Sequence, residues 1–86
     1  MLGKTLLVQE NLMELGKGIT VDKAVRFGRP VIRGTRVPVE LVLGKLAGGM
    51  SYDELCAEYE ITRENVLAAL DYAARTVASE QVHVAV

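Results

Sequence analysis

Residues 51–66 have the sequence SYDELCAEYEITRENV, and this stretch contains two helix starts separated by a short turn. Ser51 is followed three residues later by Glu54, the spacing of a capping box in which each side chain accepts a hydrogen bond from the other residue's backbone N–H. Thr62 is a typical N-cap residue for the next helix. With residues 60–62 as the turn, the stretch has the spacing of a helix-turn-helix.

The surrounding sequence adds one helix before this stretch and extends the helix after it. We expect a first helix at residues 38–47, a second helix opened by Ser51 and a third opened by Thr62. Pro38 suits the first position of a helix, and the glycines at 48–49 suit its end. Each helix has apolar residues at helical spacing. These are Val39, Val42, Leu43 and Leu46 in the first, Tyr52, Leu55, Cys56 and Tyr59 in the second, and Val66, Leu67, Leu70, Ala73, Ala74 and Val77 in the third.

Residues 19–39 precede the helices and are expected to be extended. Two apolar segments, residues 31–32 and 37–39, flank a turn in which Gly34 can adopt a positive φ angle. This pattern predicts a β-hairpin with a tight turn. The expected fold class is therefore mostly α, with an N-terminal β-hairpin followed by three helices.

A two-stranded hairpin is barely stable by itself in water. It should therefore lie on the helices or pair with its copy in a second subunit, and the second arrangement predicts a homodimer. The apolar hairpin residues that we expect at this dimer interface are Val31, Ile32 and Val37.

The two ends of the chain are less informative. Residues 1–18 form an N-terminal extension that could be a short helix or a strand. Residues 79–86 alternate loosely and could be a strand, a partner-binding tail or a frayed end. The hairpin and the helices together define one domain over residues 19–78.

Composition favours a small intracellular protein without catalytic chemistry. A chain of 86 residues accommodates one domain, and its single cysteine, Cys56, suits a reducing compartment. No signal peptide or membrane-spanning run is visible, so we expect a cytoplasmic location. The only histidine, His83, has no second histidine or cysteine nearby. We therefore expect no enzyme activity, no catalytic residue, no metal and no cofactor.

Charge is unevenly distributed although the net charge is only −1. Residues 23–36 contain five basic and no acidic residues, whereas the chain from Ser51 onward contains seven acids and two arginines. The hairpin arginines can neutralise DNA phosphates, or they can pair with the acids of the second and third helices. Composition leaves these alternatives open.

A helix-turn-helix contacts bases with the first turn of its second helix. Including that turn, the candidate DNA-binding residues are Arg29, Arg33, Arg36, Arg63 and Asn65. Glu64 and Asp71 on the same helix would repel phosphates.

Residues 28–39, with the sequence GRPVIRGTRVPV, resemble the hallmark stretch of domain-of-unknown-function family 433. The resemblance extends over about residues 19–76. It implies a homeodomain-like helix-turn-helix after a β-hairpin, and a role as a VapB-type antitoxin. Such a protein would neutralise a PIN-like ribonuclease toxin and, as a dimer, bind its own promoter. The alternative is a dimeric protein-interaction module that does not bind DNA.

Overall fold

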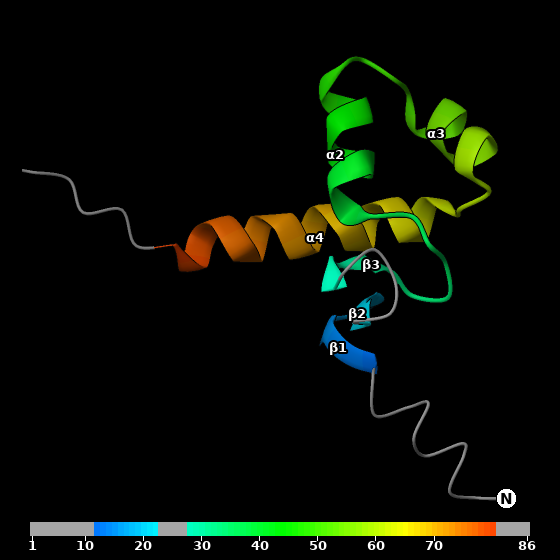
Figure 1. The fold of residues 1–86 in the computed structure, drawn as a ribbon. Coiled ribbons are helices and arrows are strands. Elements are labelled where there is room, and N and C mark those ends of the chain that lie inside the picture. Colours follow the sequence, from blue (N-terminus) through cyan, green and yellow to red (C-terminus); the bar gives the residue numbers. More distant parts are fainter. Residues whose placement is uncertain (1–11, 23–27, 81–86) are drawn as a thin grey trace, which may run out of the picture.

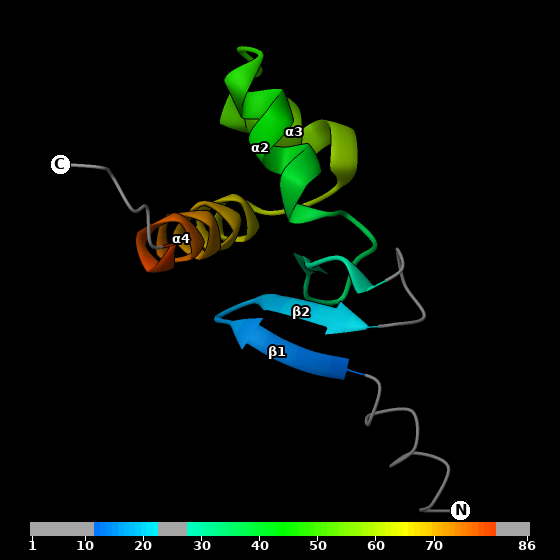
Figure 2. The ribbon, with the colours of Figure 1, turned by 60° about the vertical axis from the view of Figure 1, so that its left-hand side comes forward.

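The computed structural model describes residues 12–22 and 28–80, which form a small antiparallel sheet followed by three helices (Figure 1). In chain order, the elements of the described residues are β1 (Leu12–Gly16), β2 (Ile19–Asp22), β3 (Val31–Ile32), α2 (Val39–Ala47), α3 (Tyr52–Tyr59) and α4 (Arg63–Ser79). The long helix α4 lies between the sheet and the α2–α3 pair, as Figures 1 and 2 show from two directions. The predicted order of N-terminal β-structure followed by three helices is confirmed, and the described residues form a small mixed α/β domain.

The sheet differs in detail from the predicted hairpin. Its order is β1-β2-β3, and both neighbouring pairs are antiparallel. The predicted tight turn is present, with Gly34 at φ 76° and the Thr35 N–H donating to the Ile32 carbonyl at 3.0 Å. The predicted second arm, residues 37–39, is not a strand. Pro38 makes only an isolated bridge to Val31, because the chain enters α2 at the next residue.

Strand β1 falls inside the segment that the sequence leaves undecided between helix and strand. Residues 12–16 are extended and pair with β2 across a tight turn at Lys17 and Gly18. The sheet therefore begins before residue 19, the predicted start of the domain. The rest of the predicted N-terminal extension, residues 1–11, lies outside the described residues.

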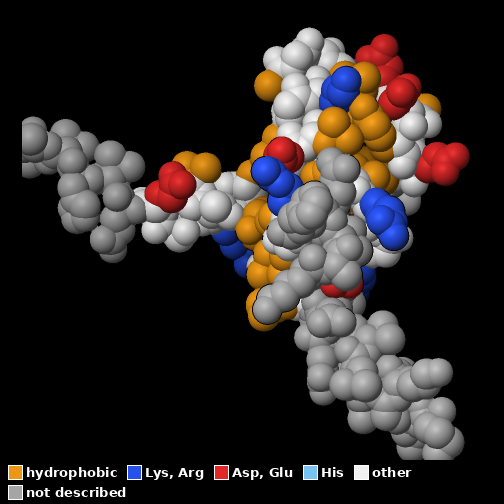
Figure 3. Space-filling view, in the orientation of Figure 1, with side chains coloured by type: hydrophobic (Ala, Val, Ile, Leu, Met, Phe, Trp, Pro, Cys, Tyr) orange, Lys and Arg blue, Asp and Glu red, His pale blue; other side chains and the backbone are white. Residues whose placement is uncertain are grey.

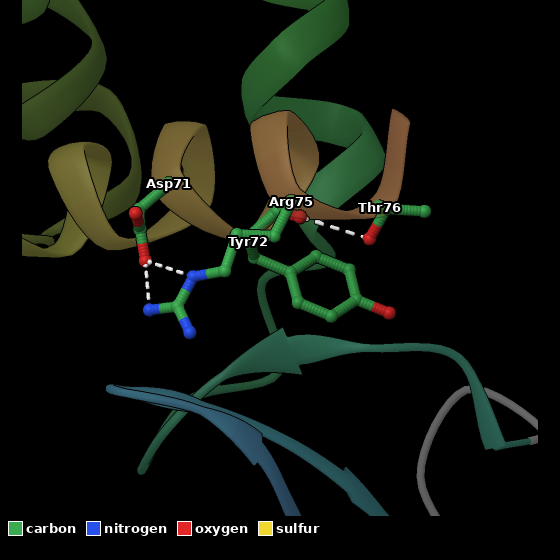
Figure 4. Close-up of polar contacts among 4 residues, drawn as sticks. All are labelled: Asp71, Tyr72, Arg75 and Thr76. Carbon is green, nitrogen blue, oxygen red and sulfur yellow. Dashed lines mark hydrogen bonds and ion pairs between the residues drawn. The ribbon is translucent and has the colours of Figure 1, made fainter. Parts of the chain in front are cut away.

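One apolar core joins the sheet to all three helices. The buried side chains of this core are Ile19, Ile32, Val39, Val42, Leu55, Ile61, Val66 and Ala69. On its other side, α4 approaches the sheet closely: a Cβ atom built on Gly18 would lie 3.2 Å from the Cβ of Ala68. Figure 4 shows the Tyr72 ring between α4 and the strands. α4 is thus packed on two sides.

Both predicted helix starts are confirmed at α3 and α4. In the Ser51–Glu54 capping box, the Ser51 N–H donates to the Glu54 carboxylate at 2.9 Å, and the Glu54 N–H donates to Ser51 Oγ at 3.1 Å. The bond from the Ser51 backbone lowers the pKa of Glu54 because it favours the charged carboxylate. Thr62 caps α4 in the same way, and α4 ends at Ser79. At α2, Pro38 is the N-cap rather than the first helical residue.

Two glycines that face open space should respond in opposite ways to replacement by alanine. Gly34 has a φ of 76°, whereas Gly44 lies inside α2, and a Cβ atom added at either position would meet nothing within 4 Å. Gly34→Ala should lower the free energy of unfolding by about 1–2 kcal/mol, the cost of a left-handed conformation for alanine. Gly44→Ala should raise it by about 0.5–1 kcal/mol, because glycine in a helix loses more entropy on folding. Urea denaturation of both variants checks this, and a loss of stability in Gly44→Ala would contradict the assignment of α2.

Candidate nucleic-acid interface

A cleft of about 560 Å³ lies where the β1–β2 turn and the turn after β3 meet the first two turns of α4. Its lining residues are Lys17, Gly18, Arg33, Glu64, Asn65, Leu67 and Ala68. Arg33 and Asn65, two of the predicted DNA-binding residues, therefore come together although they are far apart in the sequence. The structure places the other three, Arg29, Arg36 and Arg63, outside this lining.

Backbone contacts bring Arg33 to the cleft. The Arg33 N–H donates to the Gly18 carbonyl at 2.8 Å, which ties the turn after β3 to the β1–β2 turn. The Arg33 guanidinium forms an ion pair with the carboxylate of Glu14 on β1, and these side chains are 58% and 47% exposed. Ion pairs this exposed are usually worth about 0–1 kcal/mol. A phosphate can therefore replace Glu14 as the partner of Arg33 at little cost.

Asn65 also has a structural role that was not predicted from the sequence. Its side-chain oxygen accepts the Thr62 N–H at 2.9 Å, and its own N–H donates to Thr62 Oγ1 at 3.0 Å. The spacing of three residues from Thr62 was the available signal, as it was for Glu54 after Ser51. Because the side-chain oxygen already accepts the Thr62 N–H, the side-chain NH₂ of Asn65 is the group that can donate to a ligand.

Lys17 was not among the predicted site residues. It is exposed and occupies the two-residue turn between β1 and β2 together with Gly18, whose φ is 83°. The sequence Gly16-Lys17-Gly18 was a turn signal, but the hairpin could not be recognised while β1 was undecided. Lys17 and Arg33 bring two positive charges to the cleft and Glu64 brings one negative charge, while Glu14 pairs with Arg33 from outside the lining.

Arg63 lies on the other side of the α4 N-terminus. Its guanidinium carbon is 4.8 Å from the ring centroid of Tyr52 on α3, within the range of a cation–π contact. This contact orients the Arg63 side chain across the junction of α3 and α4. The charge remains at the exposed start of α4, but Arg63 is not part of the cleft lining.

The remaining arginines are dispersed. Arg29 forms an ion pair with Glu40 in the first turn of α2, and Arg36 is exposed. The acids that pair with the hairpin arginines in the described residues are thus Glu40 and Glu14, not acids of the second and third helices. On the face drawn in Figure 3, the Lys and Arg side chains do not gather into one patch. The basic residues at 23–27 lie outside the described residues.

The side chains predicted for the dimer interface are mostly buried within their own chain. Val31 is 3% exposed and Ile32 is 0% exposed, while Val37 packs on the core and is partly buried. Of the two predicted arrangements, hairpin on the helices or hairpin paired with its copy, the structure has the first: β2 pairs with β3 and the sheet lies against α4 of the same chain. Val31 and Ile32 cannot supply an apolar contact surface to a second subunit.

Other chemistry has little support in the described part of the chain. No group of three or more His, Cys, Asp or Glu residues within residues 12–22 and 28–80 is arranged to hold a metal ion. Cys56 is partly buried and packs against the core. His83 lies outside the described residues. None of the described helices has the length and apolar character needed to cross a membrane.

Comparison with known proteins gives a family and one informative structure. The chain is similar to the crystal structure of Rv2018 from Mycobacterium tuberculosis, with 31% sequence identity and a TM-score of 0.59. The match covers 66% of this chain but only 27% of that one, so two thirds of this chain corresponds to about a quarter of Rv2018. No curated protein matches the chain. The family model described as "Protein of unknown function (DUF433)" matches residues 19–73, and the chain belongs to this family.

Proposed function

We propose that this protein is a cytoplasmic, dimeric DNA-binding regulator of the antitoxin type, in which α3, the turn at residues 60–62 and α4 act as a helix-turn-helix. The observation that carries the proposal is the meeting of Arg33, Lys17 and Asn65 beside the exposed first turn of α4. In a helix-turn-helix, that turn contacts base edges while neighbouring groups contact phosphates.

The proposed roles follow from the chemistry of each side chain. Arg33 and Lys17 would bind phosphates, because each cation that neutralises a phosphate releases a counterion. The Asn65 amide and the Arg63 guanidinium would donate to acceptors at the groove edge. Arg63 is held for this by its contact with Tyr52.

Packing limits how far α4 can enter a groove. The sheet covers α4 at Ala68 and Tyr72, so only its first turns are accessible beside the cleft. Further along the helix, Asp71 and Arg75 form an ion pair and provide no net positive charge. We therefore expect binding that depends mainly on phosphate contacts, with modest sequence preference and strong salt dependence.

Fluorescence anisotropy with a labelled duplex from upstream of the gene tests the DNA-binding role. Arg33→Ala should weaken binding and reduce the slope of log K against log salt by about 1, because one phosphate contact is lost. Lys45→Ala is the matched control, since Lys45 is also an exposed cation but lies at the end of α2, away from the cleft. Equal losses for the two variants would contradict a specific role for the cleft.

Removing the charge of Glu14, the ion-pair partner of Arg33, should change the DNA affinity in the opposite direction. Glu14→Gln removes the carboxylate that competes with phosphate for Arg33, so the affinity for the same duplex should rise. The structure of the free protein should change little, because the pair is exposed. Weaker binding by Glu14→Gln would show that Glu14 positions Arg33 rather than competing for it.

The antitoxin role is supported by the resemblance and concerns a protein partner. We expect the chain to bind a PIN-like ribonuclease encoded beside it and to relieve the growth arrest that this nuclease causes. Co-expression of the two proteins, followed by affinity purification through the nuclease, measures both effects. Growth arrest that persists when the chain is co-expressed in excess would refute this role and leave DNA binding untouched.

The second candidate is a dimeric protein-interaction module that does not bind DNA. Glu64 and Asp71, both exposed on α4, favour it because they repel phosphates. Capture of the nuclease together with no anisotropy change at low salt would select this candidate.

A further inference from the structure

The turn at residues 33–36, between β3 and α2, has a conformation that its own hydrogen bonds fix. The Ile32 N–H donates to the Val37 carbonyl at 3.0 Å and closes the base of the loop. The Thr35 N–H and the Thr35 hydroxyl both donate to the Ile32 carbonyl, at 3.0 and 2.7 Å. The Val37 N–H donates to Thr35 Oγ1 at 3.0 Å. Because Ile32 is fully buried, the turn projects from the core as a preformed element.

Two arginines lie on this tight turn. Arg33 and Arg36 are both exposed, and Gly34 between them is exposed as well. A Cβ atom added at Gly34 would meet nothing within 4 Å, so the tip of the turn is open to solvent. Among the described residues, Arg33 has an ion-pair partner in Glu14, whereas Arg36 has none. Arg36 can therefore bind a partner without giving up a contact of the described chain.

The turn at 33–36 lies beside the start of α4. Arg33 lines the cleft together with Glu64 and Asn65 of the first turn of α4. In Figure 1 the chain from β3 to α2 runs out at the end of the molecule where α4 begins. A homeodomain binds DNA with a helix in the major groove and a chain segment in the adjacent minor groove. The positions of α4 and of this turn allow the same two contacts.

We infer that the turn at 33–36 binds in the minor groove next to the α4 contact, with the Arg36 side chain inserted. The inference rests on the proposed function and adds a second groove to it. The minor groove is only about 6 Å wide, so a helix does not enter it. An arginine on a tight turn with a glycine at its tip is slim enough to do so.

Insertion of Arg36 predicts a preference for A·T base pairs. The minor groove of A·T tracts is narrow and has an enhanced negative potential that attracts arginine. A G·C pair instead places the N2 amino group of guanine in the minor groove, and this group is a donor that cannot accept from a guanidinium. Arg33 does not provide the preference, because its backbone bond to the Gly18 carbonyl keeps it at the cleft.

Fluorescence anisotropy with three labelled duplexes of equal length tests the inference. One contains A·T pairs, one contains G·C pairs and one contains I·C pairs, in which inosine lacks the N2 amino group of guanosine. The I·C duplex therefore resembles G·C in the major groove and A·T in the minor groove. The protein should bind the A·T and I·C duplexes at least about fivefold more tightly than the G·C duplex, the usual effect of one unfavourable base pair.

A matched pair of variants assigns the preference to the turn. Arg36→Ala should remove the preference, because the inserted side chain is lost. Lys45→Ala should keep it, since Lys45 is an exposed cation at the far end of α2. Both positions are exposed, so circular dichroism should show the wild-type helix content for both variants.

Three results overturn the inference. They are equal binding of the three duplexes, an I·C affinity that matches G·C and so points to the major groove, and a preference that survives Arg36→Ala. Absence of binding to all three duplexes at low salt would refute the proposed DNA binding as well. A failure of the inference alone is thus distinguished from a failure of the proposed function.

Discussion

The close approach of α4 to the β1–β2 turn determines the arrangement of the rest of the molecule. Gly18 lies so near Ala68 that a Cβ atom there would be 3.2 Å away, and its carbonyl accepts the N–H of Arg33 at 2.8 Å. Gly18 thus lies where three segments that line the cleft meet: the turn that carries Lys17, the turn that carries Arg33 and the first turns of α4. A side chain at position 18 would also have to adopt a φ of 83°, which only glycine tolerates easily.

The same approach divides the surface of α4 into faces with different uses. The core holds Val66 and Ala69, the sheet holds Tyr72, and the cleft borders the first two turns. Residues 74–79 at the C-terminal end of α4 are exposed, with Val77 at 68%. The helix therefore has a packed face, a face at the cleft and an exposed C-terminal end.

The helices could be predicted from sequence because their start and stop signals are local. The Ser51–Glu54 capping box and Thr62 act within four residues, and the structure has them where the spacing predicted. The sheet was harder to predict because its pairing is not local. β3 has two residues and is stabilised by β2, and β1 carries an irregularity that breaks the alternation of side chains. Without that pairing, Val31 and Ile32 looked available to a partner, whereas they are buried in the same chain.

The candidate site was partly predictable for the same reason. Arg33 and Asn65 were found from residue type and position, but nothing in the sequence indicated that they share a cleft. Lys17 was missed because its significance depends on the β1–β2 turn. The Glu14 partner of Arg33 was missed because it lies on β1, which local patterns did not identify.

The proposed function requires DNA to bind at the cleft and the first turns of α4. A titration of the ¹⁵N-labelled protein with its upstream duplex, followed by NMR, locates the binding surface. We expect shifts of the backbone amides of Lys17, Gly18 and Arg33 and of the first turns of α4, and a loss of these shifts at high salt. The amides around Lys45 should not shift. Shifts confined to the C-terminal end of α2, or no shifts at low salt, would refute DNA binding at the cleft.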